Sequence, residues 1–121
     1  PMSLWEGNQP IEKIETLYHQ GQLTKKITAK ALDFIKRNKE NPFFLYIPHP
    51  MPHQPIAASE MFLGKSELGL YGDVIMEIDW SVGKIIEALK NYNIDEKGSN
   101  LANEKIREAR RLKKAEQKRN S

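Results

Sequence analysis

One histidine of this sequence, His53, stands where a side chain could take part in catalysis. It lies in the proline-rich stretch 48–55, directly after the apolar run Phe43–Ile47. An imidazole can donate or accept a proton, or bind a metal, near neutral pH, and prolines stiffen the loop that carries it. The alternative is a surface histidine with a local hydrogen bond. We expect a structural role for His49, and the prolines exclude the helix on which a four-residue spacing would bring two histidines to one metal.

Three carboxylates follow further along the chain, and each could suggest acid–base or metal chemistry. Asp73 and Glu77 are four residues apart, so they are neighbours on a helix, whereas Asp79 faces elsewhere. We expect charge at a helix start and a solvated polar face rather than a catalytic cluster. Neither a G-x-G-x-x-G sequence nor a complete phosphate loop is present, which disfavours nucleotide binding.

The basic residues are concentrated at the carboxyl end. Residues 101–121 hold eight Lys or Arg and three Glu, a net charge of +5 out of the chain total of +3, which leaves −2 for residues 1–100. The cations are Lys105, Arg107, Arg110, Arg111, Lys113, Lys114, Lys118 and Arg119. They could neutralise phosphates of RNA or DNA or bind another acidic partner. The alternative is a solvated helix without a partner.

The elements around His53 follow from the spacing of apolar residues. Helical spacing of apolar side chains predicts an amphipathic helix over Thr24–Lys39, with Thr24 as its N-cap. The continuous apolar run Phe43–Ile47 predicts a strand covered on both faces, as in parallel sheets. Residues 48–55 would then leave the carboxyl end of that strand, where open α/β sheets bind ligands.

A second helix is predicted over Gly72–Asn91, and residues 1–22 are predicted to be extended or irregular. One side of the second helix carries Val74, Ile75, Ile78, Val82, Ile85, Ile86 and Leu89. Ordering about twenty residues costs about 1–2 kcal/mol each, so the helix needs a sheet on which to bury this side. The next strand of an α/β layer does not follow, and residues 101–121 predict a charged helix with little to bury.

Length and composition restrict the number of domains, the class of protein and the kinds of site that these residues can form. The 121 residues suffice for one small domain, and 39% hydrophobic with 29% charged residues is typical of a globular chain. No apolar run approaches the roughly 20 residues of a membrane-spanning helix. The absence of cysteine excludes disulfides, thiolate metal sites and cysteine nucleophiles in these residues, and it leaves the compartment open.

Five motifs in order resemble the arylsulfatase family over about residues 4–96. They are a helix over 23–35, the strand Pro42-Phe43-Phe44-Leu45-Tyr46, the turn His53-Gln54-Pro55, the stretch Phe62-Leu63-Gly64-Lys65-Ser66, and Tyr71-Gly72-Asp73 leading into Glu77-Ile78-Asp79-Trp80-Ser81-Val82-Gly83. This resemblance implies an α/β, alkaline-phosphatase-like fold and hydrolysis of sulfate esters. It further implies a calcium ion and a formylglycine made from Cys or Ser in a Cys/Ser-x-Pro-x-Arg motif.

The resemblance also assigns a role to one residue. In the family pattern the histidine of the H-x-P turn, here His53, contacts the sulfate group and assists the leaving oxygen. The sequence lacks other parts of the family pattern: it has no cysteine, no Ser-x-Pro-x-Arg, no upstream Asp-Asp pair and no downstream Asp-Asn-Gly. We therefore assign no cofactor and no metal ligand to these residues, and calcium and formylglycine are implied only for a full-length protein.

These observations predict a sulfatase fragment with two parts. Residues 1–96 would form a partial catalytic domain, a helix–strand–loop–helix layer of an α/β fold, and residues 97–121 a basic tail, helical or disordered. A sulfate ester is the substrate expected of the full-length protein, and we expect the isolated chain to be inactive.

Two alternatives stay open. The layer could be the scaffold of a small interaction module whose basic tail binds nucleic acid or an acidic partner. The chain could also be marginally stable alone, with unpaired strand edges and an apolar helix face exposed until complementary segments cover them.

Overall fold

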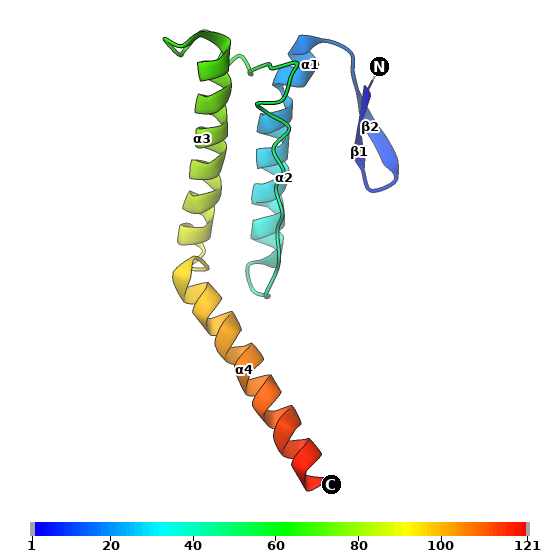
Figure 1. Cartoon of the computed structure of the whole chain (residues 1–121), viewed down its shortest axis with the longest axis vertical. Helices are drawn as coiled ribbons and strands as arrows, with labels where there is room; N and C mark the ends of the chain where they lie inside the picture. The colour runs from blue at the N-terminus through cyan, green and yellow to red at the C-terminus, as the bar shows by residue number, and fades with distance from the viewer. Residues whose placement is uncertain (1, 121) are drawn as a thin grey trace.

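The computed structural model describes residues 2–120, with side chains of residues 104, 105 and 107–120 described in the last helix. The elements are β1 (Met2–Glu6), β2 (Gln9–Ile14), α1 (Leu17–Gly21), α2 (Leu23–Asn38), α3 (Gly69–Asn91) and α4 (Glu96–Arg119). Figure 1 shows α2 and α3 lying side by side, with the hairpin β1–β2 at one end of the chain and α4 at the other. None of the helices in the described part is both long and apolar enough to cross a bilayer.

Residues 2–14 form an antiparallel hairpin, which is extended chain as predicted for residues 1–22, whereas the helix α1 in the same range was not predicted. Strand register runs from Met2 opposite Ile14 to Glu6 opposite Gln9. Gly7 turns the chain at a φ of +59°, a backbone conformation that glycine adopts without a steric penalty. Two ion pairs join the hairpin to α2: Glu12 with Lys26, and Glu6 with Lys30 at 2.7 Å.

Helix α2 matches the helix predicted over 24–39, but its start differs. The helix begins at Leu23, and Thr24 is 3% exposed inside it rather than capping it. The Thr24 carbonyl accepts a hydrogen bond of 2.7 Å from the hydroxyl of Thr28 one turn later. The buried face therefore carries two threonines as well as the apolar residues Leu23, Ala31 and Ile35.

The strand predicted over Phe43–Ile47 is not formed. The segment 42–50 runs as extended chain along α2, and its side chains alternate between partly buried and exposed. Phe43 meets Phe34 edge to face at 5.5 Å between ring centroids, whereas Phe44 is 87% and Tyr46 74% exposed. A strand requires a hydrogen-bonded neighbour, and the only sheet in the described residues is the β1–β2 hairpin. The segment thus keeps the alternation of a strand without its pairing.

Helix α3 covers the helix predicted over 72–91, but the side that it buries was predicted wrongly. Val74 is 1% exposed, while Ile75, Val82 and Ile86 are each more than 40% exposed. The buried side instead carries Asp73, Glu77 and Ser81, all at 2% or less. This side faces α2 and the loop 51–66, which offer hydroxyl groups and backbone N–H groups to polar side chains, and no described sheet covers the apolar side.

Candidate functional site

The loop that carries His53 is attached to α3 on both sides of the histidine. Met51, two residues before it, and Ala57, four residues after it, form a buried cluster with Val74 of α3. Burial of apolar side chains holds both ends of the loop to one rigid helix. His53 therefore lies at an exposed position on a loop whose two anchors are fixed.

The imidazole of His53 is held by its own loop. Its backbone N–H donates to the carbonyl of Pro50 at 3.2 Å, and its Nδ1 lies 2.7 Å from the carbonyl oxygen of Gln54. Because a carbonyl oxygen can only accept, Nδ1 carries the proton, and the Nε2 of the neutral ring keeps its lone pair. The exposed ring thus has Nε2 left to accept a proton or, once protonated, to donate one to an anion.

The second histidine of the loop, His49, takes the opposite tautomer. Thr28 donates its hydroxyl proton to Thr24, so Ser81 must donate across the 2.5 Å contact to Thr28. Ser81 Oγ then accepts from His49 Nε2 at 3.4 Å, which leaves His49 Nδ1 without a proton. That nitrogen is buried with no partner among the described residues, and desolvation lowers the pKa of His49. His49 is therefore a neutral, structural residue that joins the loop to α2 and α3.

Two carboxylates of α3 hold the chain that follows the histidine loop. Asp73 accepts from the backbone N–H of Ser66 at 2.7 Å and of Gly64 at 2.8 Å, and Glu77 accepts from the N–H of Ser59 at 2.9 Å. The N–H groups of Ser66 and Gly64 hold the pKa of Asp73 below its usual range. The prediction of a solvated polar face was thus wrong for both residues, since each is 2% exposed. Asp79 is exposed, as predicted.

The site offers one exposed histidine on a fixed loop; Asp73 is engaged through both carboxylate oxygens, and Glu77 through Oε2, while its Oε1 is buried without a partner among the described residues. Among the side chains that the structure describes, no group of three or more His, Cys, Asp or Glu is arranged to hold a metal ion. Asp73 and Glu77 point to backbone N–H groups instead. The described residues do not fit a calcium site, so the chemistry that follows from them is proton transfer and anion contact at His53.

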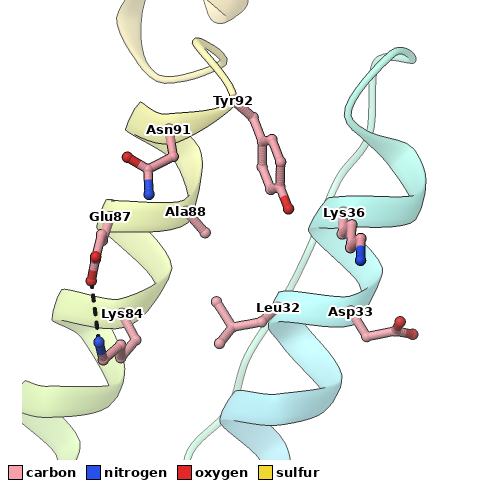
Figure 2. Close-up of a pocket in the computed structure, with 8 residues that line it drawn as sticks. All are labelled: Leu32, Asp33, Lys36, Lys84, Glu87, Ala88, Asn91 and Tyr92. Carbon is pink, nitrogen blue, oxygen red and sulfur yellow. Dashed lines mark hydrogen bonds and ion pairs between the residues drawn. The ribbon is translucent and has the colours of Figure 1, made fainter.

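A separate groove of about 510 Å³ lies between the second halves of α2 and α3. Figure 2 shows Leu32 of α2 directed toward α3, with Tyr92 at the end of α3 leaning toward α2. Lys84 and Glu87 form an ion pair at 3.3 Å on its wall, and Lys39 lies 4.9 Å from the centre of the Tyr92 ring. The histidine loop contacts α3 at Val74 and Ser81, whereas the groove is lined by α3 residues from Lys84 onward, so this groove is not part of the His53 site.

Sequence reasoning missed the polar contacts that hold the loops to the helices. Asp73, Glu77 and Ser81 recur at intervals of four, which places them on one face of α3 together with Val74 and Ile78. A face that mixes apolar and polar residues at this spacing is the signal that could have revealed buried, hydrogen-bonded carboxylates. The hydroxyl of Thr28 comes from another helix, and its place in the network depends on how the helices pack.

Comparisons with known proteins agree on one family. A family model described as Sulfatase matches residues 2–98. N-acetylgalactosamine-6-sulfatase of Homo sapiens is 46% identical over 76 residues, which are 62% of this chain and 15% of that protein. Steryl-sulfatase of Homo sapiens is 45% identical over 72 residues, 60% of this chain and 12% of that protein.

A solved structure gives the same picture in three dimensions. It comes from work on the metabolism of multiple glycosaminoglycans by Bacteroides thetaiotaomicron and is 40% identical in sequence. The TM-score is 0.60, and the similarity covers 62% of this chain and 16% of the solved one. The chain thus spans about 15% of the length of the relatives that it matches.

Proposed function

The chain belongs to the sulfatase family, as its ordered motifs predicted, and from that premise we propose that it supplies the substrate-side histidine of a sulfate-ester hydrolase. The activity belongs to a whole protein of which this chain covers one part of an α/β, alkaline-phosphatase-like catalytic domain. Residues 1–96 form that part, and residues 97–121 form a basic extension outside it. The match of the family model, which ends at residue 98, supports this division.

The observation that carries the proposal is the tautomer of His53. Its Nδ1 proton is donated to Gln54, so Nε2 is the ring atom available to a substrate. A protonated imidazole at this position donates a hydrogen bond to a sulfate oxygen and places positive charge beside it. The same proton can pass to the oxygen of the leaving alcohol as the sulfur–oxygen bond breaks, which is general acid catalysis.

The surroundings of His53 serve this role by fixing the ring. Met51 and Ala57 anchor the loop to Val74, and the contact of His49 with Ser81 adds a polar attachment. A donor held in place before the substrate arrives loses little freedom during the reaction. Catalysis also requires a nucleophile, and the family supplies it from a Cys or Ser motif that is absent from these residues. We therefore expect no turnover of a sulfate ester by the isolated chain.

The test is a chimera with a relative. The 76 matched residues of human N-acetylgalactosamine-6-sulfatase are replaced by those of this chain, and sulfate release from N-acetylgalactosamine 6-sulfate is measured. We expect turnover by the chimera and a loss of kcat of about 100-fold or more in its His53→Ala variant, in line with the loss of a general acid. His49→Ala is the control for loop structure, and it should lower thermal stability more than His53→Ala does. A folded, active chimera in which His53→Ala keeps its kcat would contradict the proposal.

A further inference from the structure

Helix α4 is the part of the chain that the sulfatase site does not use. It runs from Glu96 to Arg119 and makes no contact with another described helix or strand. Figure 1 shows it leading away from α2 and α3. Every described side chain of this helix is exposed, so all of them can reach a partner from solvent.

The cations of α4 are not spread evenly around the helix. Arg107, Arg110, Arg111, Lys114 and Lys118 recur at intervals of three and four. At about 100° per residue they lie within an arc of roughly 100°, and they extend over about 16 Å of the helix axis. We call this set the cationic face. Glu104, Glu108 and Glu116 all fall outside its arc.

Four of the five charges of the cationic face are available to an external anion. Arg107, Arg110, Arg111 and Lys114 are exposed, and no ion pair joins any of them to a carboxylate in the described part of the chain. Guanidinium groups bind sulfate or phosphate oxygens through two parallel hydrogen bonds. A linear array of such groups matches a polymer that repeats its anions along one direction.

We propose that the cationic face of α4 binds a sulfated polysaccharide. The choice of polymer rests on the proposed function, because a sulfate-ester hydrolase that acts on a polymer gains from a second contact that raises the local concentration of its substrate. The helix has no aromatic residue on which a nucleic acid base could stack. The helix can therefore contact a ligand only through its cations, which suits a polysaccharide that is recognised by its sulfate groups.

Binding by the whole chain tests this proposal without requiring turnover. The probes are chondroitin 6-sulfate, the same polymer after chemical desulfation, and a 20-base-pair DNA duplex, each measured by calorimetric titration at low and moderate salt. We expect the sulfated polymer to bind at least about tenfold more tightly than either of the others. We also expect its affinity to fall with salt, as counterion release requires. Equal affinity for the desulfated polymer, or tighter binding of the duplex, would overturn the proposal.

Matched charge reversals locate the site. The double variant Arg110→Glu with Lys114→Glu removes one Arg and one Lys from the cationic face, and Lys105→Glu with Arg119→Glu removes the same pair of residue types outside it. The first should weaken binding of chondroitin 6-sulfate by about tenfold or more and the second by less than about threefold, although both change the net charge equally. Equal weakening by the two double variants would mean that binding depends only on the net charge of the chain, and it would contradict binding at the cationic face. Circular dichroism of both variants checks that the helix content is retained.

The two proposals can fail separately. The chimera that tests catalysis contains only the matched sulfatase residues, whereas the binding experiment depends on α4. An active chimera whose His53→Ala variant keeps its kcat, together with selective binding of the sulfated polymer, would contradict the role of His53 alone. An active chimera together with no selective binding would contradict the role of the cationic face alone.

Discussion

Replacement of Glu77 by alanine tests whether buried carboxylates hold the loop onto α3. The substitution removes the acceptor of the Ser59 N–H, which is buried and has Glu77 as its partner at 2.9 Å. Leaving a buried donor unsatisfied costs about 1–3 kcal/mol, and the lost methylene adds about 0.8 kcal/mol. We expect the free energy of unfolding to fall by about 2–4 kcal/mol.

The assay has a global and a local readout. Thermal unfolding followed by far-ultraviolet circular dichroism should show a melting temperature lower by at least about 8 °C, since about 4–8 °C corresponds to 1 kcal/mol in a domain of this size. Amide hydrogen exchange should become faster at residues 56–63 first, because these residues lose their attachment to α3. Glu77→Gln, which keeps an oxygen acceptor, should have a smaller effect.

Asp79→Ala is the matched control for this experiment. It removes an exposed carboxylate two residues away on the same helix, and we expect a change within about 0.5 kcal/mol. If Glu77→Ala and Asp79→Ala behaved alike, the carboxylate of Glu77 would not support the loop. If Glu77→Ala raised the stability, the desolvation of the carboxylate would exceed the value of its hydrogen bond, and the reasoning would be refuted.

Two further perturbations address other attachments. The pKa of Asp73 is lowered in the folded chain, so its contribution to stability is complete above the unfolded pKa of about 3.9 and is lost as the pH falls through the lower folded value. The free energy of unfolding, measured between about pH 5 and pH 2, should therefore depend less on pH in Asp73→Asn than in the unchanged chain. Identical pH profiles of the two proteins would contradict this. Gly21→Ala would place a Cβ 2.6 Å from the backbone oxygen of Ala58 and should lower the melting temperature. In Gly83→Ala the new Cβ meets nothing within 4 Å, and the variant should stabilise α3 by about 0.5–1 kcal/mol. Equal shifts of the melting temperature in the two variants would contradict this difference.

The positions of α2 and α3 could be predicted because the spacing of apolar residues along one segment suffices to place a helix. Helical spacing placed α2 within one residue at each end, and the predicted Gly72–Asn91 lies inside α3. Capping was predicted less well, since Thr24 serves the interior of α2 and not its start. The hairpin was missed although Gly7 and Asn8 between two short runs are a turn signal.

Other features depend on contacts that the local pattern does not encode. The run 43–47 has the side-chain pattern of a strand, but pairing depends on a neighbour that this pattern does not encode. Glu77 could be placed on a helix face from sequence, yet its burial depends on the loop that folds over it. His53 could be selected from its proline-rich surroundings, but its tautomer follows only from the carbonyl of Gln54.

The extended segment 42–49 also has a consequence for synthesis in the cell. Its outward side chains Phe44 and Tyr46 are exposed, and no described strand pairs with its backbone. Chains leave the ribosome at about 5–20 residues per second, so this edge is in solvent for seconds before α3 (Gly69–Asn91) is complete. Nascent chains on one messenger RNA would then present identical edges to one another, and a chaperone that covers aromatic side chains would find its binding site at Phe44 and Tyr46.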